Sequence, residues 1–368
     1  MTGGGIGGGG VLDAWARLLP TLPDPAAGRQ VAELERALAD RFGIAHAVAV
    51  SSGTAALHTA LVGLGIGPGD EVLVPALSVV MSVAPVIYTG ARPVFVDCTP
   101  DGGDLDYVDV EARTSNATRA VMPVHLWGRL ADPRRLLDFA TRRRLHIVED
   151  ACQAQGSRTG VRPAGTLGTV GCFSLKDGKI IWSGEGGYLL TDDPDLAGRC
   201  RAFRSHWQNP PPGQAPLAEL GHNYRLAEPL AVLARANLDR FDELLARRRR
   251  QSTLLLSLLD RAPGIVPLHP REEWNGYSPL ARLTVPSPRA FCERLATHGV
   301  PNSVGTFRLV PTDQRPPFRD PTRPLCRNAA TLIDTTLAVV VTDHDTDQRI
   351  AAYAQTITRE ARQWAPPA

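Results

Sequence analysis

The segment that decides the fold runs from residue 71 to residue 150 and contains four short apolar runs: EVLVPA (71–76), PVFVD (93–97), AVMPVHL (120–126) and HIVED (146–150). Helical spacing of apolar residues is expected between them, through the eighties and over about residues 132–143. Short apolar strands that alternate with helices are typical of a mostly parallel sheet covered on both faces. The segment therefore predicts an α/β domain.

The flanking sequence extends this pattern. An amphipathic helix is expected over residues 29–43, and a helix that begins at Gly53 follows the strand AVAVSS (47–52). The runs CFSL (172–175) and GYLLTD (187–192) would complete the sheet. We expect three regions: a flexible segment over residues 1–28, a large α/β domain over 29–235 and a small C-terminal α+β domain over 236–368.

The C-terminal region begins with a long helical pattern over about residues 227–260. It contains the basic run Arg247–Arg250, which we interpret as a solvated helix face rather than a binding patch. A strand near residues 280–285 and a helix near 289–299 follow, with two more helical stretches after them. This mixture indicates an α+β domain.

Composition excludes several classes of partner. The 368 residues are 43% apolar and 21% charged, with a formal net charge of +2, so neither nucleic acid nor a membrane surface is an expected partner. No apolar run is long enough to span a bilayer. The six cysteines are scattered without metal-ligand spacing, which predicts reduced thiols in a cytoplasmic protein and no metal site.

Lysine is the rarest charged residue of the chain. Lys176 and Lys179 are the only lysines among 40 basic residues, and all the others are arginine. Lysine can form an imine with an aldehyde, whereas arginine cannot. Small residues surround Lys179, because Ser174 lies five residues before it and the run SGEGG (183–187) follows it. Taken alone, this pattern also fits a surface lysine.

Two further segments contain residues suited to bind a phosphorylated ring. Asp150 ends the strand HIVED, where open α/β sheets bring ligand-contacting groups together, although it could instead cap a following helix. The run SSGTAAL (51–57) brings the amides of Gly53 and Thr54 to a helix start, where an anion is favoured. A plain strand-to-helix turn is the alternative.

The order of six motifs resembles one enzyme family. The motifs VSSGTAAL, PVHLWG, VEDACQAQG, FSLKDGK, SGEGG and GHNYRLAE occur in the order found in the DegT/DnrJ/EryC1/StrS family of pyridoxal-phosphate (PLP) dependent sugar and cyclitol aminotransferases. The resemblance extends from about residue 29 to the end of the chain. It implies fold type I, the aspartate aminotransferase-like fold of PLP-dependent transferases.

The resemblance also implies a role for each motif residue. Lys179 corresponds to the lysine that forms the Schiff base with PLP, and Asp150 to the partner of the pyridine nitrogen. The remaining positions are implied as cofactor-binding: Gln153 near the phenolic oxygen, Gly53, Thr54 and Ser174 on the phosphate, Asn223 on the phosphate of a neighbouring subunit, and His125, for which a buried structural role fits equally well. Shared active sites imply a homodimer.

The implied reaction is transfer of an amino group from L-glutamate or L-glutamine to a keto sugar or keto cyclitol. The segment FSLKDGKIIWSGEGG is closer to the branch that aminates keto-inositols for aminoglycoside-type antibiotics. Two departures keep a different PLP reaction open, namely elimination, decarboxylation or cyclisation of an amino acid. Val79 stands where relatives have an aromatic residue against the pyridine ring, and the C-terminal third matches less well. A relative that binds its ligand without turnover is a further alternative.

Overall fold

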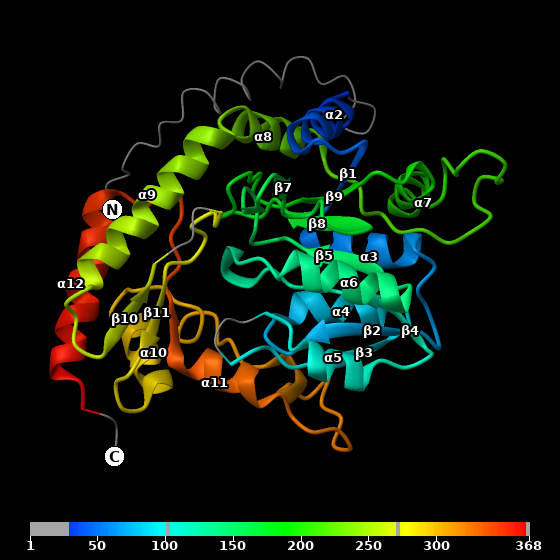
Figure 1. The fold of residues 1–368 in the computed structure, drawn as a ribbon. Coiled ribbons are helices and arrows are strands. Elements are labelled where there is room, and N and C mark those ends of the chain that lie inside the picture. Colours follow the sequence, from blue (N-terminus) through cyan, green and yellow to red (C-terminus); the bar gives the residue numbers. More distant parts are fainter. Residues whose placement is uncertain (1–28, 101–103, 270–272, 366–368) are drawn as a thin grey trace.

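A computed structural model describes residues 29–100, 104–269 and 273–365 and contains one large sheet (Figure 1). Its strand order is β1-β9-β8-β5-β4-β2-β3. The strands are β1 (His46–Val50), β2 (Glu71–Pro75), β3 (Arg92–Val96), β4 (Thr118–Val121), β5 (His146–Asp150), β8 (Val170–Ser174) and β9 (Gly187–Thr191). Only β9 runs against both of its neighbours, so the prediction of a mostly parallel sheet is confirmed.

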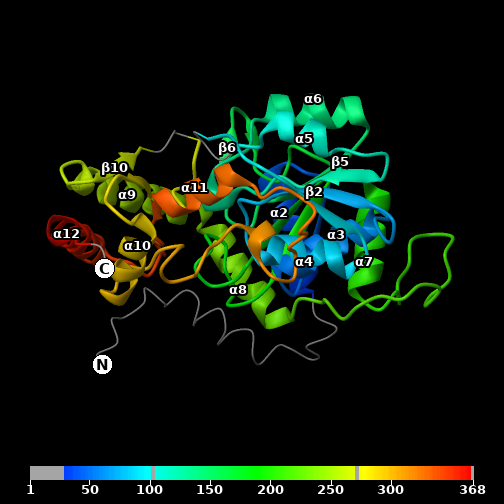
Figure 2. The same cartoon turned by 90° about the horizontal axis from the view of Figure 1, so that it is seen from below.

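Helices cover both faces of this sheet. The helices α3 (Gly53–Gly63) and α4 (Val80–Tyr88) lie on one face, and α5 (Tyr107–Arg113) and α6 (Pro133–Arg143) lie on the other (Figure 2). Within β2, Val72 and Val74 join the core cluster beneath α3 and α4, whereas Leu73 joins the cluster beneath α5 and α6. Successive strand residues point to opposite faces. Burial on both sides therefore explains why these strands are continuously apolar.

A third cluster covers the edge of the sheet that carries β1 and β9. Helix α2 (Gln30–Phe42) contributes Leu34 and Leu38, and Phe173 of β8 stacks on Tyr188 of β9 at 4.6 Å. Helix α8 (Glu228–Asp239) packs against α2 and belongs to the same cluster. The expected domain boundary at residue 235 thus falls inside α8.

The long helical pattern over residues 227–260 is interrupted in the structure. The chain leaves helical geometry at Arg240, where α8 ends and α9 (Phe241–Leu259) begins. Helix α9 runs from beside the large sheet to the small C-terminal part of the molecule (Figure 1). It is the element that can bring C-terminal side chains to the large sheet.

The C-terminal part is built on a three-stranded antiparallel sheet, as the α+β prediction requires. Its strands are β10 (Ile265–Leu268), β11 (Leu280–Leu283) and β12 (Thr336–Ala338). The helices of this part are α10 (Pro288–Thr297), α11 (Arg327–Thr335) and α12 (Asp347–Gln363). The expected flexible segment 1–28 lies outside the described residues. Among the described helices, none is both long enough and apolar enough to cross a bilayer.

Candidate active site

The two lysines lie in the loop that connects β8 to β9. Gly178 turns this loop with a φ of +84°, a conformation that favours glycine. Gln155 holds both ends of this loop, since its side chain donates to the carbonyl of Ser174 and accepts from the amide of Ile181. Lys176 is exposed, whereas Lys179 is only 9% exposed. The local structure therefore separates the two lysines and buries Lys179.

Asp150 lies at the carboxyl end of β5 and is buried. Its Oδ2 accepts a hydrogen bond from Ser82 Oγ at 2.6 Å, and its Oδ1 accepts one from the amide of Cys152 at 3.1 Å. Residues 151–156 form turns, so Asp150 does not cap a helix there. Ser82 belongs to α4 and is fully buried. Sequence reasoning did not identify Ser82, because no motif distinguishes it from other helix serines.

The N-terminus of α3 approaches Ser174 closely. A Cβ on Gly53 would lie 2.8 Å from Cys152 Sγ and 3.0 Å from the Ser174 Cβ, so only glycine fits there without a shift. Gly53 and Thr54 are the first residues of the helix, and amides in the first turn have no partner inside the helix. Together with the helix dipole, these amides and the Ser174 hydroxyl can bind an anion.

Cys152 lies near Asp150, Gly53 and Lys179. Burial raises the pKa of its thiol well above the ordinary value, the negative charge of Asp150 raises it further, and the positive charge of Lys179 opposes both. The thiol is therefore neutral and lies within electrostatic reach of the carboxylate and the amine. Cys152 therefore contacts Asp150, faces the α3 N-terminus at Gly53 and lies within electrostatic reach of Lys179.

Gln153 and His125 hold the loop that follows β4. Gln153 is half-buried, and its Oε1 accepts from the amide of Trp127 at 2.7 Å. His125 is buried, with Nε2 lying 3.0 Å from Glu149 Oε2 and Nδ1 accepting a long bond from the amide of Ala131. Both ring nitrogens of His125 have protein partners. This geometry favours the structural alternative for His125 over cofactor binding.

Asn223 lies outside this cluster, on the surface. Its side chain is exposed, and its backbone forms a bridge with Ser205. The next residue, Tyr224, accepts a hydrogen bond at its carbonyl from the amide of Ser51, just before α3. The structure thus brings Asn223 to the surface beside the segment that leads into α3, but not into contact with Lys179.

Two residues of the site were missed by the sequence analysis, and one of them corrects it. Tyr277 accepts a hydrogen bond from Lys179 Nζ at 3.0 Å. Arg248 was interpreted as part of a solvated face, but it is 1% exposed and donates to the carbonyl of Gly178. A sequence signal for it existed, because Arg248 lies four residues after the buried Leu244 on the apolar face of α9.

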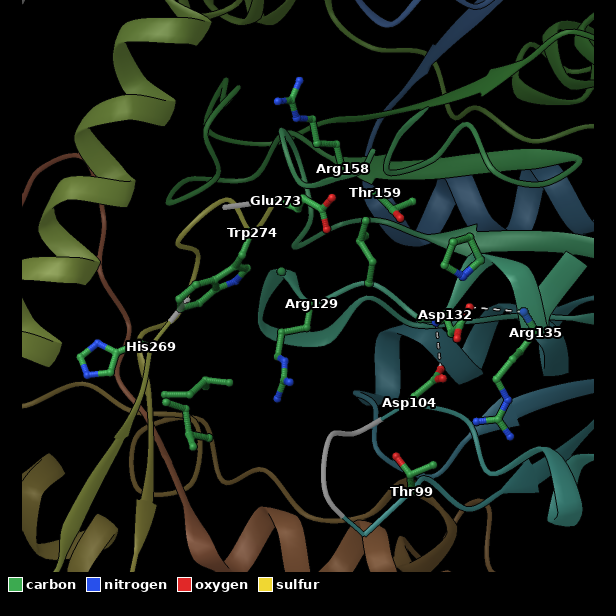
Figure 3. Close-up of a pocket in the computed structure, with 16 residues that line it drawn as sticks. Thr99, Asp104, Arg129, Asp132, Arg135, Arg158, Thr159, His269, Glu273 and Trp274 are labelled. Carbon is green, nitrogen blue, oxygen red and sulfur yellow. Dashed lines mark hydrogen bonds between the residues drawn. The ribbon is translucent and has the colours of Figure 1, made fainter. Parts of the chain in front are cut away.

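A separate cavity of about 520 Å³ lies between the large sheet and the C-terminal part (Figure 3). Its charged lining residues are Asp104, Arg129, Asp132, Arg135, Arg158, His269 and Glu273. Trp274 closes one side, where its Nε1 donates to the carbonyl of Trp127. Its lining includes none of the site residues expected from the sequence.

Comparison with known proteins identifies the family of the chain. The profile of the DegT/DnrJ/EryC1/StrS aminotransferase family matches residues 25–358. GDP-perosamine synthase of Caulobacter vibrioides is 43% identical over 223 residues, which cover 61% of this chain and 60% of that protein. L-glutamine:2-deoxy-scyllo-inosose aminotransferase of Streptomyces kanamyceticus is 39% identical over 265 residues, 68% of this chain and 62% of that protein. The matched segments thus span about three fifths of these two relatives.

The fold also matches solved structures over nearly the whole chain. DesV of S. venezuelae, solved in complex with a ketimine intermediate, superposes with a TM-score of 0.83 at 31% identity. The superposition covers 96% of this chain and 95% of that one. The C-terminal third, which matched the motifs less well, therefore keeps the same fold.

Proposed function

Because the chain belongs to the DegT/DnrJ/EryC1/StrS aminotransferase family, we propose that it is a PLP-dependent aminotransferase that transfers an amino group from L-glutamate or L-glutamine to a keto sugar or keto cyclitol. One observation carries this proposal. Cys152 contacts the buried carboxylate of Asp150, faces the N-terminus of α3 and lies within electrostatic reach of the buried amine of Lys179. A lysine, a carboxylate and a phosphate cradle are what a phosphorylated pyridine aldehyde needs.

The residues present fit PLP. The missing Cβ of Gly53 leaves the α3 N-terminus beside Ser174, so the amides of Gly53 and Thr54 and the Ser174 hydroxyl would hold the phosphate. These three ligands are neutral, and the helix dipole favours a dianion there. Asp150 would bind the pyridine nitrogen, and Gln153 would lie near the phenolic oxygen. Lys179 would hold the aldehyde carbon.

The chain's own groups then have defined tasks. When bound, PLP supplies an aldehyde that links to an amine and a ring that withdraws electrons. Asp150 keeps a proton on the ring nitrogen, and the Ser82 hydrogen bond fixes the carboxylate in place. The Lys179 amine takes the proton from the α-carbon of the amino donor as general base. The same amine can later return a proton as general acid.

The acceptor is a ketone on a polyhydroxylated ring. GDP-perosamine synthase acts on a sugar nucleotide by its name, and the second relative acts on 2-deoxy-scyllo-inosose. The segment FSLKDGKIIWSGEGG supports a keto-inositol acceptor and a role in aminoglycoside-type antibiotic biosynthesis. We propose a cytoplasmic enzyme, in keeping with six cysteines that form no disulfide in the described part of the chain.

We also propose a homodimer in which Asn223 completes the phosphate site of the partner subunit. Asn223 is exposed, and large apolar side chains near it or on α4 are exposed as well: Met81, Tyr88, Leu217 and Leu220. Large apolar side chains exposed in this way favour a surface that contacts another chain.

The decisive experiment follows the visible absorbance of the lysine-linked cofactor. We expect L-glutamate or L-glutamine to bleach it while one equivalent of oxo acid and of pyridoxamine phosphate appears. A keto-inositol or keto nucleotide sugar should then restore it. Loss of the α-hydrogen or carboxylate without pyridoxamine phosphate would favour elimination, decarboxylation or cyclisation instead. Lys179→Ala must abolish the borohydride-reducible link, and Lys176→Ala is its matched control. A link that survives Lys179→Ala would overturn the proposal.

A further inference from the structure

We propose that Tyr277 and Arg248 form a buried pair that positions the Lys179 amine and sets how readily this amine reacts. The proposal rests on the proposed function, since it assigns these residues a role in the work of Lys179. Both residues come from the C-terminal part of the chain, Tyr277 just before β11 and Arg248 from α9. No family motif of the large domain contains them.

Tyr277 contacts the reacting atom directly. Lys179 Nζ donates to Tyr277 Oη at 3.0 Å and lies 4.7 Å from the centre of the Tyr277 ring. A hydrogen bond and a ring face at the same nitrogen restrict where the amine can lie. An amine that acts as a base must lie within reach of one carbon atom, so this restriction matters for its task.

The position of Tyr277 is itself fixed from two sides. Asn275 accepts from the amide of Tyr277 and donates to the carbonyls of Gln153 and Gln155. The carbonyl of Gly276 accepts from Ser252 on α9. The segment that carries Tyr277 is therefore held between α9 and the turns after β5. Tyr277 is a fixed partner for Lys179 rather than a mobile surface side chain.

Arg248 contacts both the backbone beside Lys179 and the ring of Tyr277. Both of its terminal nitrogens lie 3.2 Å from the carbonyl of Gly178, the residue before Lys179, and its guanidinium carbon lies 5.8 Å from the Tyr277 ring centre. Its nearest carboxylate, Asp343, is 3.9 Å away, and Arg248 Nε has no hydrogen-bond partner among the described residues. A buried charge with such weak pairing costs free energy of folding, which indicates a role other than stability.

The charges around Tyr277 favour its phenolate form. Burial by itself would raise the pKa of Tyr277, but the positive charge of Lys179, its hydrogen bond and the charges of Arg248 and Lys176 outweigh burial and lower it. Arg248 stabilises the Tyr277 phenolate, and a phenolate oxygen is a stronger acceptor for the Lys179 hydrogen bond than a neutral phenol.

The test uses the fact that the chain has two lysines. The full-length protein without added cofactor is reductively methylated with labelled formaldehyde, and modification at Lys179 and Lys176 is measured by peptide mass spectrometry. We expect Tyr277→Phe to raise the Lys179 to Lys176 ratio of initial rates at least threefold, because an amine that has lost its hydrogen-bond acceptor is freer to reach the reagent. Tyr353→Phe, which removes another tyrosine hydroxyl near an arginine, should leave the ratio unchanged.

A second readout follows tyrosine ionisation by ultraviolet absorbance in the same proteins. The wild type should contain one phenol, absent from Tyr277→Phe, that ionises below pH ~10, the ordinary range for tyrosine. Arg248→Met should move this ionisation to higher pH. An unchanged methylation ratio in Tyr277→Phe, or superimposed titrations of wild type and Tyr277→Phe, would overturn the inference. Neither readout requires cofactor or substrate, so both stand even where transamination itself fails.

Discussion

Ser82 Oγ on helix α4 lies 2.6 Å from Asp150 Oδ2 at the end of strand β5, and both residues are buried. The carboxylate that we assign to the ring nitrogen is therefore held by a helix on one face of the sheet. A hydrogen bond to a buried charged group contributes about 1.5–3 kcal/mol. This bond couples the packing of α4 to the orientation of the Asp150 carboxylate.

We expect Ser82→Ala to lower the free energy of unfolding by about 1–3 kcal/mol and the rate of the first half-reaction about tenfold. The carboxylate loses its only side-chain partner in the described part of the chain and is free to turn away. Denaturant unfolding and single-turnover absorbance measure the two effects. Ser257→Ala, at an exposed serine of α9, is the matched control. Normal kinetics in Ser82→Ala would show that Asp150 needs no such support.

Gly53→Ala should weaken cofactor binding at least tenfold. The added Cβ would lie 2.8 Å from Cys152 Sγ and 3.0 Å from the Ser174 Cβ, so the α3 N-terminus must move away from Ser174. Equilibrium dialysis with PLP gives the affinity. Gly67→Ala is the control, since its Cβ would meet only the Thr89 carbonyl at 3.7 Å. If Gly53→Ala binds PLP as tightly as the wild type, the phosphate lies elsewhere.

The sequence predicted the large sheet well because its strands are buried on both faces. Residues such as Leu73 and Val74 are apolar in succession, so the strands EVLVP and HIVED stand out regardless of tertiary context. The same reasoning extended the strand at 120–126 too far, since β4 ends at Val121 and the chain beyond it turns toward Trp127.

The site was predictable only where its chemistry shows in a motif. Lys179 and Asp150 lie in recognisable segments, but Tyr277 and Arg248 come from distant parts of the chain and meet Lys179 only through α9 packing. Arg248 looked like a surface residue because three other arginines flank it. Its burial depends on the long-range contact with the Gly178 carbonyl, which no local pattern encodes.

The buried His58 should make the fold less stable in mild acid. Burial lowers its pKa to about 4, and the positive charge of His222 lowers it further. The contribution of neutral His58 to the free energy of unfolding is thus fully present above pH ~6.5. It is lost as the pH falls toward 4, because only the unfolded chain binds the proton in that window. Between pH ~6.5 and pH ~4, we expect the free energy of unfolding to fall by roughly 2 kcal/mol less in His58→Gln than in the wild type.

Urea unfolding at pH 4.5, 5.5 and 7 measures this dependence. His269→Gln, which removes an exposed histidine, should follow the wild type at every pH. The difference between wild type and His58→Gln isolates one residue from the carboxylates that also titrate in this range. Parallel curves for these two proteins would contradict the assignment of the acid sensitivity to His58.

Subunit mixing tests the shared site that we assign to Asn223. Lys179→Ala should be inactive, and Asn223→Ala should bind PLP weakly and retain little activity at low PLP concentration. In a mixed dimer, one site carries both changes and the other carries neither. An equal mixture of the two variants, unfolded and refolded together, should therefore recover about a quarter of wild-type activity, because half of the dimers are mixed and each has one intact site. Activity that stays at the mean of the two separate variants would place Asn223 in the site of its own subunit.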